Sequence, residues 1–390
     1  MGQMRGDILD THDITESRGF LPGSDPLAAF NTPSHDEAVA SYLDELDDIG
    51  QQLPNLLESR SFRPVAEELT PPPRELFDTL SQREIERLCL LSSFFASGYI
   101  HEIGSPSVQR LPAGVAVPLY RTSMYLGRKP IAAYDTICLR NFTMRDPDVG
   151  FEVDNIKPVQ RFTNLSDETW FVAIHVSIEA AAGQALTACA RAQRAIVAHD
   201  RDTVHDALET IAESLETQTA SMRRMTEGNE PEAFVNGFRP YYQGFDGVSF
   251  EGVPELDGEP QTLRGGSGAQ SSALPSIDAA LGIEHEATEL IDKLDDMRSY
   301  MPKVHREAIM AFGEGPDIAD FVEAQDDVEL VEAYNRCVDG IGAFREVHFQ
   351  QVAQYIRKLS DDVKGTGGTD YMTFLPKMKR ETEHQRLDHP

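Results

Sequence analysis

Apolar residues recur at steps of three or four along the segment 330–359, which is the spacing of one face of an α-helix. The residues on this face are Tyr334, Cys337, Ile341, Phe344, His348, Val352, Tyr355 and Leu359. The same spacing predicts helices over 83–103, 167–199 and 200–225, and another that begins at about Asp36. Strand patterns are sparse, although 145–161 alternates like a small hairpin. We therefore expect a mainly α fold.

The expected domain organisation follows from this division. We place a boundary near residue 160, between a smaller, mostly helical N-terminal domain over 1–160 and a larger all-helical domain over 161–390. With 390 residues, 40% of them apolar and 26% charged, the composition is globular, and the core is large enough to enclose a cofactor.

Charge and cysteine usage narrow the possible partners and the compartment. A formal net charge of -30 repels nucleic acid and anionic membranes, so we expect neither as a partner. Cys89, Cys138, Cys189 and Cys337 lie far apart without a CxxC pair, which indicates isolated thiols in a reducing compartment. The N-terminus lacks a hydrophobic signal region, and no apolar run reaches membrane-spanning length, so we expect a cytoplasmic protein.

A histidine interrupts the apolar face of the last long helix. His348 points to the interior, where an imidazole must be hydrogen-bonded, protonated and paired, or bound to a metal. Taken alone, a satisfied core histidine is the favoured interpretation. No HExxH motif and no two-histidine, one-carboxylate spacing occurs in the sequence. A lone helical histidine as the only obvious protein ligand is typical of haem.

An arginine lies one helical turn before this histidine. Arg345 occupies nearly the same face, and a buried arginine needs an anion. Haem propionates would supply one on the side of the iron ligand. The alternative partner is a protein carboxylate such as Asp278, and both contacts are compatible with each other.

A second set of candidates lies in the segment "PEAFVNGFRPYYQGF". Phe234 and Phe238 flank Arg239 with further aromatic residues, a combination suited to a small molecule that carries an aromatic ring and a carboxylate. A surface arginine beside core aromatics is the simpler interpretation of this stretch alone. His175 follows Phe171 by four residues and also faces inward, as a second axial ligand, a distal hydrogen-bonding group or a core histidine.

Two glycine-rich loops, "RGGSGAQSS" and "VKGTGGTD", lack the GxxxxGK[ST] phosphate-binding pattern. Their glycines permit close approach of the backbone to a ligand, or they serve as linkers.

Many ordered segments together resemble the indoleamine 2,3-dioxygenase family. They are "GFLPGSDPL", "LPAGVAVPLYRTSMYLGRKP", "AYDTICLRNF", "IEAAAGQA", "GGSGAQSS", "DMRSYMP", "VHFQQVAQYI" and "KGTGGTDYMTFL". The resemblance implies a small N-terminal domain, covering the distal side of the pocket, and a larger helical domain that holds haem b. It makes His348 the proximal iron ligand, Arg345 the propionate-side arginine and Asp278 the carboxylate partner of that arginine.

The resemblance also implies a substrate pocket. In it Phe234 packs on the indole ring, Arg239 binds the substrate carboxylate and Tyr134 lines the inner pocket, with Phe171 beside it. The remaining pocket residues that it implies are Gly266 and Ser267, in a loop near substrate and haem, and Thr366, in a loop that closes over the substrate. Together with His175, the residues Phe234 and Arg239 are the ones we expect to take part in catalysis.

Three departures from the mammalian pattern bear on substrate range. Val235 stands where a second phenylalanine is usual, which widens the pocket. His175 replaces a serine and is similar to the distal histidine of the sister family, tryptophan 2,3-dioxygenase. The segment before "KGTGGTD" is short.

The resemblance implies a monomeric enzyme that adds both atoms of O2 across the indole C2–C3 bond of L-tryptophan and gives N-formylkynurenine. An external electron donor would keep the iron ferrous. Two alternatives stay open from the sequence: the same chemistry on another indole, and a non-enzymatic carrier or sensor with haem held by His348 and His175. A helical protein without a cofactor is the simplest reading of the pattern alone.

Overall fold

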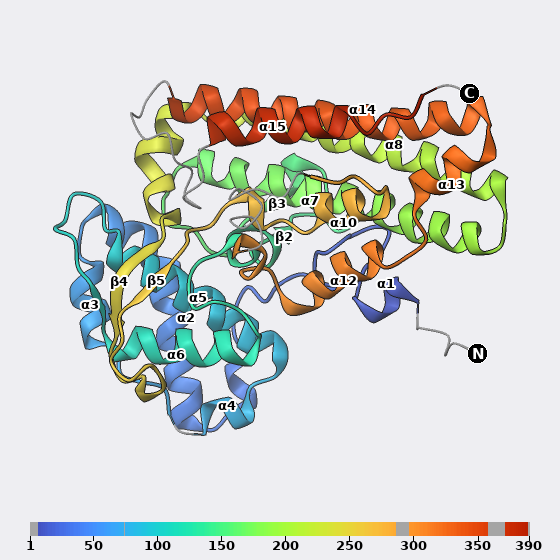
Figure 1. The fold of residues 1–390 in the computed structure, drawn as a ribbon. Coiled ribbons are helices and arrows are strands. Elements are labelled where there is room, and N and C mark those ends of the chain that lie inside the picture. The colour runs from blue at the N-terminus through green and yellow to red at the C-terminus, as the bar shows by residue number, and fades with distance from the viewer. Residues whose placement is uncertain (1–6, 74, 286–295, 358–370, 389–390) are drawn as a thin grey trace.

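The computed structural model describes residues 7–73, 75–285, 296–357 and 371–388. Helices account for 64% of the structure and strands are few, so the expected mainly α class is confirmed. Figure 1 shows a row of long helices along one side of the molecule, with a group of shorter helices below it.

The lower group is formed by the N-terminal part of the chain. Its helices are α2 (Glu37–Glu58), α3 (Phe62–Glu68), α4 (Leu76–Thr79), α5 (Gln82–Ile100) and α6 (Ala113–Tyr125), preceded by α1 (Ile8–Thr11) beside the long helices. Local sequence fixes where the main helices begin. Ser81 and Glu84 form a capping box at the start of α5, and the Asp36 carboxylate accepts two backbone N–H groups at the start of α2.

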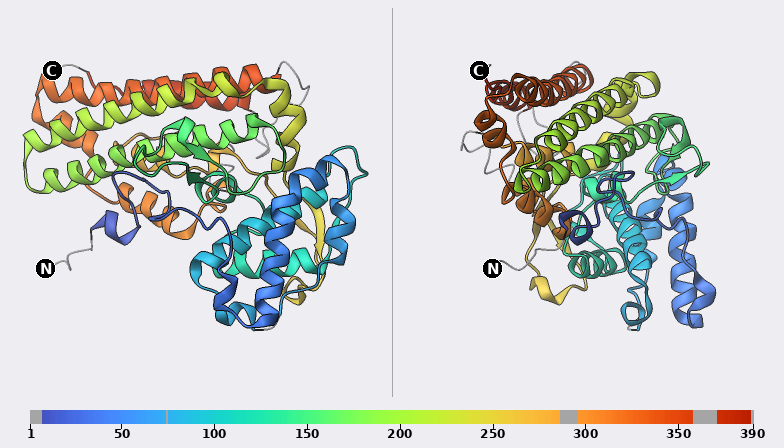
Figure 2. Two further views of the ribbon diagram at one scale, coloured as in Figure 1. Left: turned by 180° about the vertical axis from the view of Figure 1, so that it is seen from behind. Right: turned by 90° about the vertical axis from the view of Figure 1, so that its right-hand side faces the viewer.

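The upper row contains three helices predicted from periodicity, α7 (Ser166–Val197), α8 (Arg201–Arg223) and α14 (Val328–Val352). It also contains α15 (Tyr371–Glu383), which periodicity did not predict, and the shorter helices α9 (Met225–Gly228), α10 (Ala273–Ala280), α12 (Lys303–Gly313) and α13 (Ile318–Gln325). Both α7 and α14 pack on α8, while α7 and α14 make few close backbone contacts with each other. Figure 2 gives the reverse and end-on views of this arrangement.

Three segments adopt the wider π-helical conformation, which the sequence pattern did not indicate. They are η2 (Asp135–Leu139), η4 (Ala233–Phe238) and η8 (Ala353–Arg357). Short 3-10 turns complete the helical structure: η1 (Thr32–Ser34), η3 (Val153–Asn155), η5 (Arg239–Tyr242), η6 (Pro254–Leu256) and η7 (Gly268–Gln270). The segment predicted as one helix over 330–359 is therefore α-helical only as far as Val352.

The strands are short and join distant parts of the chain. β2 (Thr143–Met144) and β3 (Ile156–Lys157) pair antiparallel, so the expected hairpin exists but its first strand lies just before residue 145. β1 (Arg110–Leu111) runs parallel to β4 (Phe245–Phe250), which pairs antiparallel with β5 (Gln261–Leu263). The three-stranded sheet thus connects residues on both sides of position 160. The domain boundary at that position stays a prediction.

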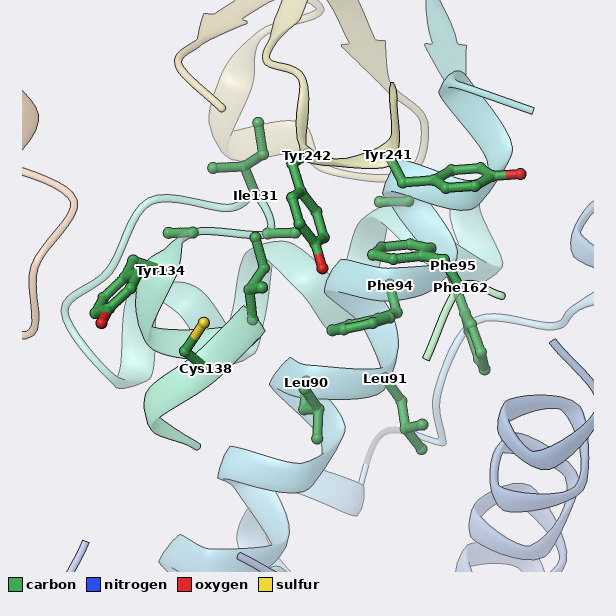
Figure 3. Close-up of a cluster of buried hydrophobic side chains, with 14 of the residues drawn as sticks. Leu90, Leu91, Phe94, Phe95, Ile131, Tyr134, Cys138, Phe162, Tyr241 and Tyr242 are labelled. Atoms are coloured by element: carbon green, nitrogen blue, oxygen red, sulfur yellow. The ribbon is translucent and has the colours of Figure 1, made fainter. Parts of the chain in front are cut away.

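The hydrophobic core also crosses this position. Phe94 of α5 stacks on Phe162 at 4.2 Å between ring centroids, and Phe162 stacks on Tyr241 at 4.8 Å. Figure 3 shows these rings with Tyr242 in one aromatic column between the helices. Such stacking adds to the free energy gained from burying each ring, and it holds the two parts of the chain together.

The N-terminal segment lies directly on the middle of α7. Gly19 adopts φ +55, and a side chain there would come within 2.5 Å of the Glu179 carbonyl oxygen. A Cβ at Gly183 would lie 2.5 Å from the Glu16 carbonyl oxygen. Both positions therefore require glycine, because any Cβ would separate the two backbones.

Helix α7 is long and apolar enough to cross a membrane, and 67% of that apolar window is buried inside the protein. Its hydrophobicity therefore belongs to a core helix that is covered on most sides.

Candidate active site

His348 lies on the long helix α14, one helical turn after Arg345. Burial, together with the nearby His175, lowers the pKa of His348 to about 4. The side chain is nevertheless only half-buried by surface area. Among the described residues neither ring nitrogen has a hydrogen-bond partner. The ring is therefore neutral near pH 7, and at least one nitrogen carries a free lone pair.

His175 lies on α7, near His348. Its Nδ1 lies 2.7 Å from the Phe171 carbonyl oxygen, which can only accept a hydrogen bond. Nδ1 must therefore carry the proton, and burial lowers the pKa of the ring, so His175 is neutral. This tautomer leaves Nε2 unprotonated, as a hydrogen-bond acceptor or a potential metal ligand.

An aromatic wall continues from His175. The Phe171 ring lies 4.3 Å from the imidazole and 5.4 Å from the Phe234 ring, which it stacks on. Phe234 in turn contacts Phe238 at 5.3 Å and Tyr355 at 5.9 Å. These rings come from α7, η4 and η8, so three distant segments build one apolar surface.

Arg239 and Val235 lie on the same short segment as two of these rings. Arg239, the first residue of η5, is 6% exposed, so it is a buried arginine and not the surface arginine that was the simpler interpretation. Val235 is half-buried next to Phe234. The segment therefore presents a cation and an apolar surface together.

A second buried arginine belongs to α14. The Arg345 Nη2 lies 2.5 Å from Asp278 Oδ2, and the two residues are 5% and 8% exposed. Arg345 also donates to Thr382, and His285 Nε2 lies 3.4 Å from Arg345 Nη2. The pairing considered from the sequence therefore exists. It joins α10 to the helix that carries His348.

The glycine-rich loop that follows β5 packs closely against two other segments, which contain Tyr242 and Ile137. A Cβ on Gly265 would lie 2.1 Å from the Tyr242 carbonyl oxygen, and one on Gly266 would lie 2.3 Å from the Ile137 side chain. Ser267 is half-buried and caps η7 through its hydroxyl. Glycine at the first two positions therefore allows close approach to other segments of the protein, whereas the predicted approach to a ligand stays a prediction.

Tyr134 stands at the N-terminus of η2, opposite this loop. Its ring packs edge-on against His175 with centroids 5.8 Å apart, and its backbone N–H donates to Gln270 Oε1 at 2.9 Å. Figure 3 shows Tyr134 directed away from the aromatic column that contains Tyr242. Tyr134 thus contacts both His175 and the residue Gln270 that follows the loop.

One predicted site residue, Thr366, lies outside the described residues, and two residues near the site were not predicted as site residues. Tyr355 was predicted only as part of the apolar helix face, and Glu179 was not named from the sequence, although its position one helical turn after His175 could have indicated it. All three π-helical segments contain or adjoin a residue of the site, and such segments are frequent at functional sites.

Sequence comparison with known proteins finds relatives over nearly the whole chain. The family model described as indoleamine 2,3-dioxygenase matches residues 8–385. The chain belongs to the indoleamine 2,3-dioxygenase family. It is 30% identical to indoleamine 2,3-dioxygenase 1 of Mus musculus (98% of this chain and 97% of that protein) and 29% identical to indoleamine 2,3-dioxygenase 2 of the same species (96% and 94%). It is also 28% identical to a protein named myoglobin from Haliotis madaka (96% and 98%).

Members of this family are haem dioxygenases, and the residues of the site fit haem. His348 offers a neutral, half-buried imidazole whose nitrogens lack partners in the described parts of the chain. Iron binds such a nitrogen. Arg345 supplies a buried cation on the same helix for a carboxylate of the group.

The Arg345–Asp278 pair gives a stability prediction. Asp278→Ala leaves the Arg345 guanidinium buried without its carboxylate, so the haem-free protein should lose about 3–5 kcal/mol of unfolding free energy. Urea unfolding measures this. Glu251→Ala, which breaks the exposed Arg110–Glu251 pair at 3.0 Å, is the control and should cost about 0–1 kcal/mol. Equal losses in the two variants would contradict the assignment of a buried ion pair.

Proposed function

We propose that this enzyme inserts both atoms of O2 across the C2–C3 bond of L-tryptophan and releases N-formylkynurenine. The observation that supports this most is that two neutral, half-buried histidines, His175 and His348, lie near each other on different helices. Stacked aromatic rings lie beside His175, and a buried arginine lies on the segment that carries Phe234. A haem protein that only transferred electrons would not need Arg239 and the wall.

The proposal assigns His348 as the proximal ligand of haem b and Arg345, held by Asp278, as the contact of a propionate. Ser267 belongs to the loop beside the group. When bound in its ferrous state, haem supplies the chemistry that activates O2. The protein has to position the substrate, provide electrostatic complementarity and exclude water, so no nucleophile or general-base arrangement is required.

Several side chains around His175 and Phe234 share the recognition of the substrate. Arg239 binds the carboxylate of the amino acid, because a buried guanidinium forms strong charge-assisted hydrogen bonds with it. Phe171 and Phe234 pack against the indole ring, beside Val235 and Tyr134. Thr366 belongs to the proposed site through family resemblance.

The tautomer of His175 decides between its two possible roles. Because Nδ1–H donates to the Phe171 carbonyl, Nε2 can accept the indole N–H but cannot donate to a second acceptor. We therefore assign His175 to the indole N–H. Substrate binding should not require a proton on this ring.

The proposal includes the setting in which the enzyme works. Its four cysteines are free and buried, which suits a reducing cytoplasm. An external donor keeps the iron reduced, O2 is the second substrate, and the enzyme acts as a monomer.

The direct test is mass spectrometry of the products that reduced, haem-loaded protein forms from L-tryptophan and ¹⁸O2. We expect N-formylkynurenine with both labelled atoms. Haem-replete protein that forms no product from L-tryptophan contradicts the proposed substrate. The same assay with other indoles then tests the second candidate, a related indole substrate, which the half-buried Val235 beside Phe234 favours.

A variant at Arg239 tests recognition of the carboxylate. Arg239→Leu removes charge-assisted hydrogen bonds worth about 1.5–3 kcal/mol, so KM for L-tryptophan should rise by roughly 10- to 150-fold. Binding of tryptamine, which lacks the carboxylate, is the matched comparison and should change little. An equal loss for both ligands would show that Arg239 acts on the pocket as a whole and not on the carboxylate.

A further inference from the structure

A buried glutamate lies one helical turn beyond His175 on α7. Glu179 is 1% exposed, and its Oε1 accepts hydrogen bonds from the Tyr134 hydroxyl at 2.9 Å and the Ser271 hydroxyl at 2.5 Å. Its Oε2 has no hydrogen-bond partner within the described ranges. Burial raises the pKa of this carboxyl, while the two hydroxyl donors lower it. Within the described part of the chain, no guanidinium or ammonium group pairs with it.

The two hydroxyls belong to the two segments that flank His175. Tyr134 begins η2 and packs edge-on against the His175 ring, and Ser271 directly follows η7 in the loop that contains Gly266 and Ser267. One carboxylate oxygen therefore joins both segments to the helix that carries His175. This hydrogen bond joins residues that are far apart in the sequence, since Ser271 is 92 residues from Glu179.

A second bridge connects the same two segments but leaves α7 out. The Gln270 side chain accepts from the Tyr134 backbone N–H at 2.9 Å and donates to the Gly265 carbonyl oxygen at 2.9 Å. Gln270 thus fixes the loop relative to Tyr134. Glu179 fixes that pair relative to His175.

The energetic cost of this carboxyl indicates a specific role. Burying a carboxyl group without a cation and with one unsatisfied oxygen is unfavourable, and an apolar side chain would fill the same volume at lower cost. Two hydroxyls that meet on one oxygen are restrained in direction as well as in distance. The geometry therefore favours orientation of the pocket walls over stability of the core.

We propose that Glu179 is a positioning residue for the substrate pocket. It acts through Tyr134 and Ser271, and it sets where the Tyr134 ring and the 265–271 loop lie relative to His175. The inference rests on the proposed function only in placing an indole substrate beside these walls.

The test measures substrate affinity separately from turnover. The change in the haem absorption spectrum on titration with L-tryptophan gives Kd, and steady-state assays give KM and kcat. Glu179→Leu removes both hydrogen bonds and should raise Kd and KM about tenfold, with kcat changed less. Glu179→Gln keeps an acceptor oxygen and should restore most of the affinity.

Non-additivity identifies the route of the effect. Tyr134→Phe with Ser271→Ala should raise Kd as much as Glu179→Leu does, and adding Glu179→Leu to that pair should raise it no further. If Glu179→Leu fails to fold, the Tyr134→Phe, Ser271→Ala pair still decides, because an unchanged Kd in it overturns the proposal.

A second buried carboxyl on the same helix provides the control. Glu168 is also 1% exposed and accepts hydrogen bonds from the backbone N–H groups of Phe162 and Thr163, both at 2.8 Å. Glu168→Leu should lower stability without a comparable change in Kd. Equal effects of the two leucine variants on Kd would overturn a positioning role for Glu179. If the wild type binds an indole but forms no labelled product from L-tryptophan, the proposed function fails while this titration still tests Glu179.

Discussion

An imidazole in a protein interior needs a partner for its nitrogens, and His348 has none among the described side chains. This requirement organises the surrounding structure. Helices α7 and α14 both pack on α8 and make few close backbone contacts with each other. Burial keeps the imidazole neutral, which is the form that binds a metal. Arg345 and Asp278 place a neutralised ion pair one turn away on the same helix.

The surroundings of His175 depend on one face of α7. Phe171, His175, Glu179 and Gly183 follow each other at steps of four residues, so they lie in line along the helix. Along that line the helix supplies an aromatic surface, an acceptor nitrogen, a buried carboxyl and a place where another backbone can lie in contact. The N-terminal segment packs on the last of these positions. It therefore supports the helix behind the site.

Periodicity predicted the long helices and the inward direction of His348 and His175, because these properties depend on local spacing alone. The pairing of Arg345 with Asp278 joins residues 67 positions apart, and only the family resemblance favoured that partner over others. The π-helical turns at Asp135–Leu139, Ala233–Phe238 and Ala353–Arg357 leave no pattern that differs from an ordinary helix. Glu179 could have been found from its spacing to His175, but its two hydroxyl partners could not, since they come from distant loops.

The central proposal is that His348 would bind the haem iron, and chemical rescue tests it most directly. His348→Gly should lose the absorption and electron paramagnetic resonance signals of the haem-loaded wild type, and added imidazole should restore them by occupying the vacated position. A variant that binds haem with wild-type signals in the absence of imidazole would contradict the account.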